Sequence, residues 1–277
     1  LGHRHPRVIE AVHRQMDQLT LALPMHGIAD VSLDFVERMS AVTPGDLNFV
    51  KSYSGGSESM ESAMKFTRQY FKQTGRPGKY KFVSRYYGYH GGTFGAMAAS
   101  GTGARKTPFE PHMAGFPKVF PPNYYRDRFS SWEECNRFCA RMFEDVIMHE
   151  DPDTVAGVIL EPVSNTGGVI TPTDEYFQII REICDRYEVL LIYDEIITAF
   201  GKTGQMFGAQ TFGVTPDIIC GGKSLSSGIL PLGAMMVRED MGEAFLGPPE
   251  DNVNFAHGHT YAGNPLGCAT GIAVIGE

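Results

Sequence analysis

Three side chains that could do chemistry stand at the ends of apolar runs in this sequence. Asp194 follows one run directly, Glu161 ends a second, and Lys223 comes just after a third. Such runs suit buried strands of a parallel sheet, and open α/β sheets bind their ligands at the edge where the strands end. Any one of these acids could be a surface group or a helix cap. Two acids and a lysine at one edge together favour a binding or catalytic site.

A glycine-rich turn at residues 55–57 (GGS) opens a predicted helix at residues 58–71. The first backbone N–H groups of a helix are unpaired and favour an anion such as phosphate. Residues 222–224 (GKS) are not the end of a P-loop, because Asp217 stands where that motif needs glycine. The turn at 55–57 is not a serine-hydrolase nucleophile elbow either, since Ser59 replaces the last glycine. The turn therefore predicts a phosphate-binding cup.

A carboxylate, a lysine and a phosphate cup on one sheet edge suit pyridoxal 5'-phosphate (PLP), whose aldehyde needs an amine and whose ring nitrogen needs an acid. The chain also resembles the class III aminotransferases, the ω-amino-acid group of the fold type I PLP enzymes. The resemblance runs nearly end to end. Its motifs are GHRHP at residues 2–6, SESMESAMK at 57–65, YHG at 89–91, EP at 161–162, DEII at 194–197, PD at 216–217, GK at 222–223, HTY at 259–261 and NP at 264–265.

The resemblance implies two catalytic residues and a ring sandwich. Lys223 is expected to form the Schiff base with PLP and then to move a proton between the substrate carbon and the cofactor. Asp194 is expected to pair with the pyridinium nitrogen. Tyr89 and Ile196 are expected to pack on opposite faces of the ring, with Ile196 on the same strand face as Asp194 because two residues separate them.

The resemblance also implies the remaining cofactor contacts. Gly56 and Ser57 are expected to hold the phosphate. Thr260 is expected to reach the phosphate bound in a partner subunit, which implies a homodimer. His90 is expected beside the stacked tyrosine, and Glu161 near the ring substituents or the substrate. No metal is required.

The sequence departs from the family pattern in several places. Residues 54–56 read SGG where the family usually has Asn-Ser-Gly, so the phosphate cup lacks one hydroxyl. Ala199, Lys202 and Ser224 replace the commoner Gly, Arg and Gly. Family members continue beyond both ends of this sequence, and arginines that bind the substrate carboxylate often come from their C-terminal part. The chain is therefore expected to be a fragment without the C-terminal small domain.

The hydrophobic pattern around these residues predicts alternating strands and helices. Helices are expected at residues 8–19, 31–39, 58–71, 132–149, 174–187 and 268–275, and strands at 47–53, 79–84, 155–161, 189–194 and 217–220. Residues 102–131 are expected to form a long irregular loop. This order predicts an α/β fold with a mostly parallel central sheet and helices on both faces, as in the large domain of fold type I enzymes. A helical segment at residues 1–50 would precede a PLP-binding domain at 51–277.

Composition narrows the possible partners and setting. The net charge of the 277 residues is −8 and the basic residues are scattered, so no nucleic-acid partner is expected. No apolar run approaches the ~20 residues of a membrane helix, so no membrane association is expected. Five widely spaced cysteines suggest reduced thiols and a cytoplasmic protein. Cys135 and Cys139 lie four apart without a second pair, which argues against a metal site.

The resemblance implies that the function is that of a PLP-dependent transaminase. It would move an amino group from an ω-amino acid, an amine or an aminosulfonate, such as β-alanine or taurine, to pyruvate or another 2-oxo acid. A decarboxylase, racemase or aminomutase on the same scaffold would keep Lys223 and Asp194, and so remains an alternative. A catalytically silent PLP-binding homologue is another. A nicotinamide dehydrogenase fits poorly, since no early strand is followed by G-x-G-x-x-G.

Overall fold

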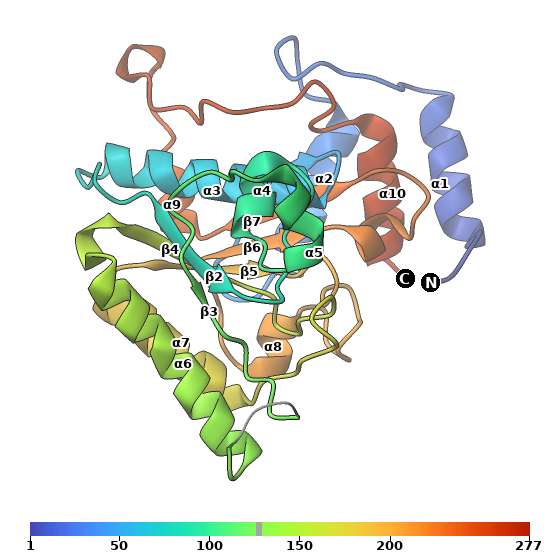
Figure 1. Ribbon diagram of the computed structural model, residues 1–277. Helices are drawn as coiled ribbons and strands as arrows, with labels where there is room; N and C mark the ends of the chain where they lie inside the picture. Colours follow the sequence, from blue (N-terminus) through green and yellow to red (C-terminus); the bar gives the residue numbers. More distant parts are fainter. Residues whose placement is uncertain (126–128) are drawn as a thin grey trace.

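A seven-stranded sheet lies at the centre of the computed structural model, which describes residues 1–125 and 129–277 (Figure 1). The strand order is β1-β7-β6-β5-β4-β2-β3, and neighbours are parallel except at β7, which is antiparallel to both β1 and β6. The mostly parallel sheet predicted from the sequence is therefore confirmed. The strands are β1 (Phe49–Tyr53), β2 (Lys81–Arg85), β3 (Lys118–Val119), β4 (Val155–Leu160), β5 (Leu190–Asp194), β6 (Ile218–Gly221) and β7 (Gly233–Val237).

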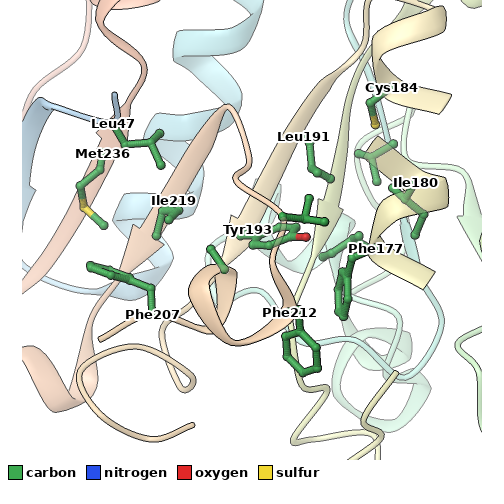
Figure 2. Packing of buried hydrophobic residues seen from close by; sticks show 14 of the residues in the cluster. Leu47, Phe177, Ile180, Cys184, Leu191, Tyr193, Phe207, Phe212, Ile219 and Met236 are labelled. Carbon is green, nitrogen blue, oxygen red and sulfur yellow. The ribbon is translucent and has the colours of Figure 1, made fainter. Parts of the chain in front are cut away.

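Alternate residues of the central strands enter separate hydrophobic clusters. Leu191 and Tyr193 of β5 belong to one buried cluster, whereas Ile192 belongs to the other. Figure 2 shows part of the first cluster, where Tyr193 lies beside Phe177 with ring centroids 5.8 Å apart. Because both faces of these strands are buried, their sequences are continuous apolar runs rather than alternating ones.

Helices cover both faces of the sheet and one end of it. α6 and α7 lie side by side over one face, and α3 covers the other. α10 packs against both α1 and α2. The helices are α1 (Pro6–Met16), α2 (Asp30–Ser40), α3 (Gly56–Gln73), α4 (Phe94–Ala99), α5 (Gly103–Lys106), α6 (Trp132–His149), α7 (Asp174–Arg186), α8 (Gly208–Phe212), α9 (Glu239–Glu243) and α10 (Pro265–Ile275), with 3₁₀ turns η1 (Thr107–Phe109), η2 (Pro152–Thr154), η3 (Lys223–Ser226) and η4 (Pro249–Asp251).

Side-chain caps fix the start of the two long helices on one face. The Ser131 hydroxyl accepts a hydrogen bond from the Glu134 N–H at 3.1 Å, and the Thr173 hydroxyl accepts one from the Tyr176 N–H at 3.3 Å. Acidic residues also occupy the first turn of both helices, where the helix dipole favours negative charge. These local signals explain why α6 and α7 begin where the sequence predicts.

The prediction of an irregular segment at residues 102–131 is wrong in part. The segment contains α5, the turn η1 and the edge strand β3, which pairs with β2 through only two residues. Elements of two to four residues leave no periodic pattern, so sequence periodicity misses them. Residues 126–128 of this segment lie outside the described residues.

In the part of the chain that the structure describes, no helix is long and apolar enough to cross a membrane.

Candidate active site

A cavity of about 420 Å³ lies at the edge of the sheet where β4, β5 and β6 end. Eight of the nine residues predicted to bind PLP line it: Gly56, Ser57, Tyr89, His90, Glu161, Asp194, Ile196 and Lys223. The structure thus brings the two acids, the lysine and the glycine turn together. Thr260 is the exception and lies in an exposed turn outside this cavity.

The N-terminus of α3 forms one wall of the cavity. Gly55 precedes the helix in an extended conformation, and no side chain caps the first N–H groups. A Cβ atom on Gly56 would lie 2.4 Å from Cδ1 of Ile196, so only glycine fits there without displacing a neighbour. The hydroxyl of Ser57 accepts a hydrogen bond from the Gly92 N–H at 3.0 Å. Uncapped N–H groups at a helix start are suited to binding an anion such as phosphate.

Asp194 ends β5 with its carboxylate held in place. Oδ2 of Asp194 lies 2.8 Å from Nδ1 of His90, and both side chains are almost fully buried. Oδ1 accepts a hydrogen bond from the Ile196 N–H at 3.2 Å. His90 is itself anchored, because its backbone N–H donates to the Ser100 hydroxyl at 2.8 Å. The carboxylate is therefore fixed by two donors from different elements, in an orientation that leaves it on the cavity wall.

The prediction that Ile196 shares a strand face with Asp194 is wrong in its geometry. β5 ends at Asp194, and Ile196 lies in the turn that follows. Strand alternation therefore does not apply to this pair. Ile196 still lines the cavity, because the backbone turn aims it against Gly56.

Glu195 points away from the cavity and anchors this turn. Its buried carboxylate accepts hydrogen bonds from the N–H groups of Gly208 at 2.5 Å and Ala209 at 2.8 Å, and from the Thr198 hydroxyl at 2.8 Å. Burial raises the pKa of Glu195, and these three donors oppose that rise. The two adjacent acids thus have different roles, since Asp194 faces the cavity while Glu195 binds the turn to α8.

Glu161 lies buried beside the same histidine and aspartate. Its Oε1 accepts hydrogen bonds from the Tyr89 N–H at 3.1 Å and the Ser164 hydroxyl at 3.2 Å. Burial raises the pKa of Glu161, His90 opposes the rise and Asp194 adds to it. Behind it, Arg85 is fully buried and donates from Nη2 to the Glu161 backbone carbonyl at 2.5 Å. Sequence reasoning missed Arg85, because an arginine within a strand carries no motif.

Lys223 begins the turn η3, directly after β6 and Gly222. Its backbone has φ of +42°, a left-handed conformation that is uncommon for residues other than glycine and that clusters at functional sites. The side chain is exposed and borders two cavities, the one described above and a neighbouring one of about 870 Å³. Lys223 therefore belongs to the wall of both cavities.

The cavity wall contains five further residues: Gly91, Arg105, Asn165, Thr166 and Ile197. Gly91 and Ile197 belong to the YHG and DEII motifs, whereas the sequence did not single out the other three. The guanidinium of Arg105 lies 5.0 Å from the centre of the Tyr89 ring. Arg105 belongs to α5, inside the segment predicted to be irregular, and no motif marks it. Among the described residues no group of three or more His, Cys, Asp or Glu side chains is arranged to hold a metal ion.

The loop that carries Thr260 is held by β1 and α3. Lys51 donates from Nζ to the His257 carbonyl at 2.7 Å, and Nζ of Lys65 lies 3.2 Å from Nδ1 of the same histidine. Gln69 accepts from the Ala256 N–H at 3.0 Å. These contacts leave Thr260 exposed at the surface.

A mostly parallel sheet with a lysine, an acid and an uncapped helix N-terminus at its carboxyl edge is compatible with a PLP-binding domain. The Aminotransferase class-III family model matches residues 1–277. The chain therefore belongs to the class III aminotransferases, as the sequence motifs indicated.

Known proteins similar to this chain are aminotransferases. It is 43% identical over 275 residues to the probable aminotransferase Rv3329 of Mycobacterium tuberculosis, and 34% identical over 278 residues to the β-alanine–pyruvate aminotransferase of Pseudomonas aeruginosa. In both comparisons the match covers 99% of this chain but only 58% and 62% of the relative. The chain thus spans about three fifths of the length of these relatives.

Two solved structures are close in fold. An amine transaminase from an uncultivated Pseudomonas species, in its PLP-bound form, matches with a TM-score of 0.94 and 34% identity over 99% of this chain and 63% of its own. The ω-transaminase from Pseudomonas jessenii, in complex with PMP, matches with a TM-score of 0.94 and 32% identity over 98% of this chain and 61% of its own. The fold is therefore that of the PLP-dependent transaminases.

The residues of this cavity fit PLP, the cofactor of class III aminotransferases. The uncapped start of α3 and the glycine at position 56 suit its phosphate. The fixed carboxylate of Asp194 suits a protonated ring nitrogen, and Tyr89 and Ile196 offer flat and apolar surfaces to the ring. Lys223 supplies the one primary amine among the lining residues of the described chain.

Proposed function

We propose that this chain is the PLP-binding part of a transaminase. The enzyme transfers an amino group from an ω-amino acid, an amine or an aminosulfonate to pyruvate or another 2-oxo acid. The observation that carries the proposal is the single cavity shared by Lys223, Asp194 and the α3 N-terminus. The similarity to a β-alanine–pyruvate aminotransferase and to amine transaminases supports the choice of amino donors.

In this proposal each lining residue has a separate task. When bound, PLP supplies an electron sink that lets the carbon beside an amine lose a proton. The Asp194 carboxylate accepts a hydrogen bond from the protonated ring nitrogen, and His90 keeps that carboxylate oriented. Nζ of Lys223 would take the proton from the substrate carbon and deliver it to the aldehyde-derived carbon of the cofactor. The first N–H groups of α3 would bind the phosphate, and Tyr89 and Ile196 would hold the ring.

The proposal includes a homodimer in a cytoplasmic setting. Thr260 lies outside its own cavity on an exposed, well-anchored loop, which suits a residue that serves the phosphate of a partner subunit. All five cysteines are buried in the core, which suits a protein that does not use them as exposed cross-links.

The first test concerns the lysine. Protein loaded with PLP is treated with borohydride, which fixes the cofactor to the lysine that binds it, and the labelled peptide is found by mass spectrometry. We expect the label on Lys223 and none in Lys223→Ala. Lys202→Ala is the matched control, since Lys202 is an exposed lysine of the neighbouring cavity. Label on another lysine in the wild type would refute the assignment.

The second test separates transamination from the other PLP reactions. Wild-type protein is mixed with an amine donor and no 2-oxo acid. A transaminase converts its cofactor to the PMP form in this half-reaction, and addition of pyruvate restores the PLP form. A decarboxylase, racemase or aminomutase would turn over its substrate without needing pyruvate, and a silent homologue would leave the spectrum unchanged.

A further inference from the structure

Arg105 places a positive charge at the mouth of the cavity. Its side chain lines the same cavity as Asp194 and Lys223, and its guanidinium lies 5.0 Å from the centre of the Tyr89 ring. Arg105 itself is exposed to solvent. The contact with the aromatic ring restrains the guanidinium beside the expected cofactor site while leaving its N–H donors accessible.

No acid of the cavity neutralises this arginine. Asp194 is held by His90 and the Ile196 N–H, and Glu161 by the N–H of Tyr89 and a serine hydroxyl. Arg105 forms no ion pair with any side chain in residues 1–125 and 129–277. The cavity therefore offers an unused cation that suits a negatively charged group of a ligand.

The chemistry of the site indicates which negative group this is. The cofactor phosphate has its own donors at the start of α3, where helix N–H groups converge. The neighbouring wall contributes Asn165 and Thr166, which are polar but neutral. A guanidinium presents a planar pair of N–H donors that matches a carboxylate. An ω-amino acid reacting at Lys223 carries such a carboxylate at the end remote from its amine.

We propose that Arg105 binds the carboxylate of an ω-amino acid substrate and thereby selects carboxylated donors over simple amines. This inference rests on the proposed transaminase function and specifies the substrate class of that site. Arg105 takes no part in proton transfer. It acts on substrate affinity, and because it is exposed and therefore screened, its effect is modest.

The test compares donors with and without a carboxylate in the PLP-loaded protein. The half-reaction is measured with β-alanine and with propylamine, which lacks the carboxylate. In Arg105→Gln we expect the apparent KM for β-alanine to rise about tenfold while propylamine is unaffected. Arg105→Lys keeps the positive charge and should show a smaller rise in the apparent KM for β-alanine than Arg105→Gln. Lys106→Gln is the matched control, because it removes the same charge one residue away, outside the cavity lining.

A binding measurement makes the test independent of turnover. Calorimetry with propanoate should show affinity about tenfold weaker in Arg105→Gln than in wild type and Lys106→Gln. Equal losses for β-alanine and propylamine, or unchanged propanoate binding, would overturn the inference. A loss of PLP affinity in Arg105→Gln would also overturn the inference, because it would show that Arg105 binds the cofactor phosphate. If the wild type reacts with neither donor but binds propanoate through Arg105, the proposed function fails while the carboxylate site stands.

Discussion

Replacing Gly56 by alanine tests how closely the proposed phosphate cup and the proposed site of the cofactor ring are packed together. The new Cβ atom would lie 2.4 Å from Cδ1 of Ile196 and 3.2 Å from its Cγ1. Carbon atoms make favourable contacts at about 3.5–4.0 Å, so the end of the Ile196 side chain has to move by roughly 1 Å. The free space that can receive it is the cavity, since Ile196 lines that space.

Two effects of Gly56→Ala follow. Overpacking of a buried site lowers the free energy of unfolding by about 1–3 kcal/mol, and we expect a decrease near 1 kcal/mol because only the end of one side chain must move. The displaced Ile196 would narrow the space proposed for the cofactor ring, and we expect PLP affinity to fall at least tenfold, or about 1.4 kcal/mol. Urea unfolding followed by circular dichroism gives the first quantity, and a PLP titration gives the second.

Two further variants control this prediction. Gly103 is also the first residue of a helix, but a Cβ atom there would meet nothing within 4 Å, so Gly103→Ala should change neither quantity by more than a few tenths of a kcal/mol. Adding Ile196→Val to Gly56→Ala removes the colliding methyl and should restore most of the PLP affinity. Unchanged PLP binding in Gly56→Ala, or no recovery in the double variant, would refute the reasoning.

Two predictions concern stability away from the cavity. Burial lowers the pKa of Lys118 to about 7 from 10.5, so between these pH values the unfolded chain binds more protons than the folded one. The free energy of unfolding should therefore rise with pH in this range, by up to about 1.4 kcal/mol per pH unit. Urea unfolding across the range should show a weaker rise in Lys118→Met than in the wild type, and an equal slope in both proteins would contradict the prediction. Asp217 is buried and accepts hydrogen bonds from Arg181 at 2.9 Å and Arg238 at 2.7 Å, so Asp217→Asn should lower the free energy of unfolding by about 3 kcal/mol. Asp185, the other acidic partner of Arg181, is exposed, so Asp185→Asn should lower the free energy of unfolding by under about 1 kcal/mol. Similar losses in the two variants would show that burial does not determine the strength of these ion pairs.

Long, regular elements were predictable from the sequence because their patterns are local. α6 has the predicted bounds, since a serine cap and a helical apolar stripe define it without reference to the rest of the chain. β4 and β5 were predictable because strands buried on both faces are uninterrupted apolar runs. β7 was not predicted, because Gly233 and Ala234 give its first half no strand signal and its position depends on pairing with β1 and β6.

The site was predictable where strand ends determine it and unpredictable where loops do. Asp194 ends β5 and Glu161 directly follows β4, and because these two strands are parallel neighbours both acids reach the same cavity. Ile196 was expected to contact the cofactor, and it does line the cavity. It reaches the cavity through a turn, however, so the geometry predicted from strand alternation was wrong. Arg105 was missed, because a four-residue helix brings it to the cavity and nothing in its local sequence indicates that contact.

The anchoring of Glu195 has a thermodynamic consequence for the cavity. Two hydrogen bonds tie the turn after Asp194 to α8, and a third joins Thr198 to Glu195 within the turn, so folding itself orders this part of the wall. Ordering a backbone residue costs about 1–2 kcal/mol of conformational entropy, and here that cost belongs to folding rather than to ligand binding. The wall is in this sense preorganised, and the affinity of the site is expected to depend on the integrity of a short helix outside the cavity lining.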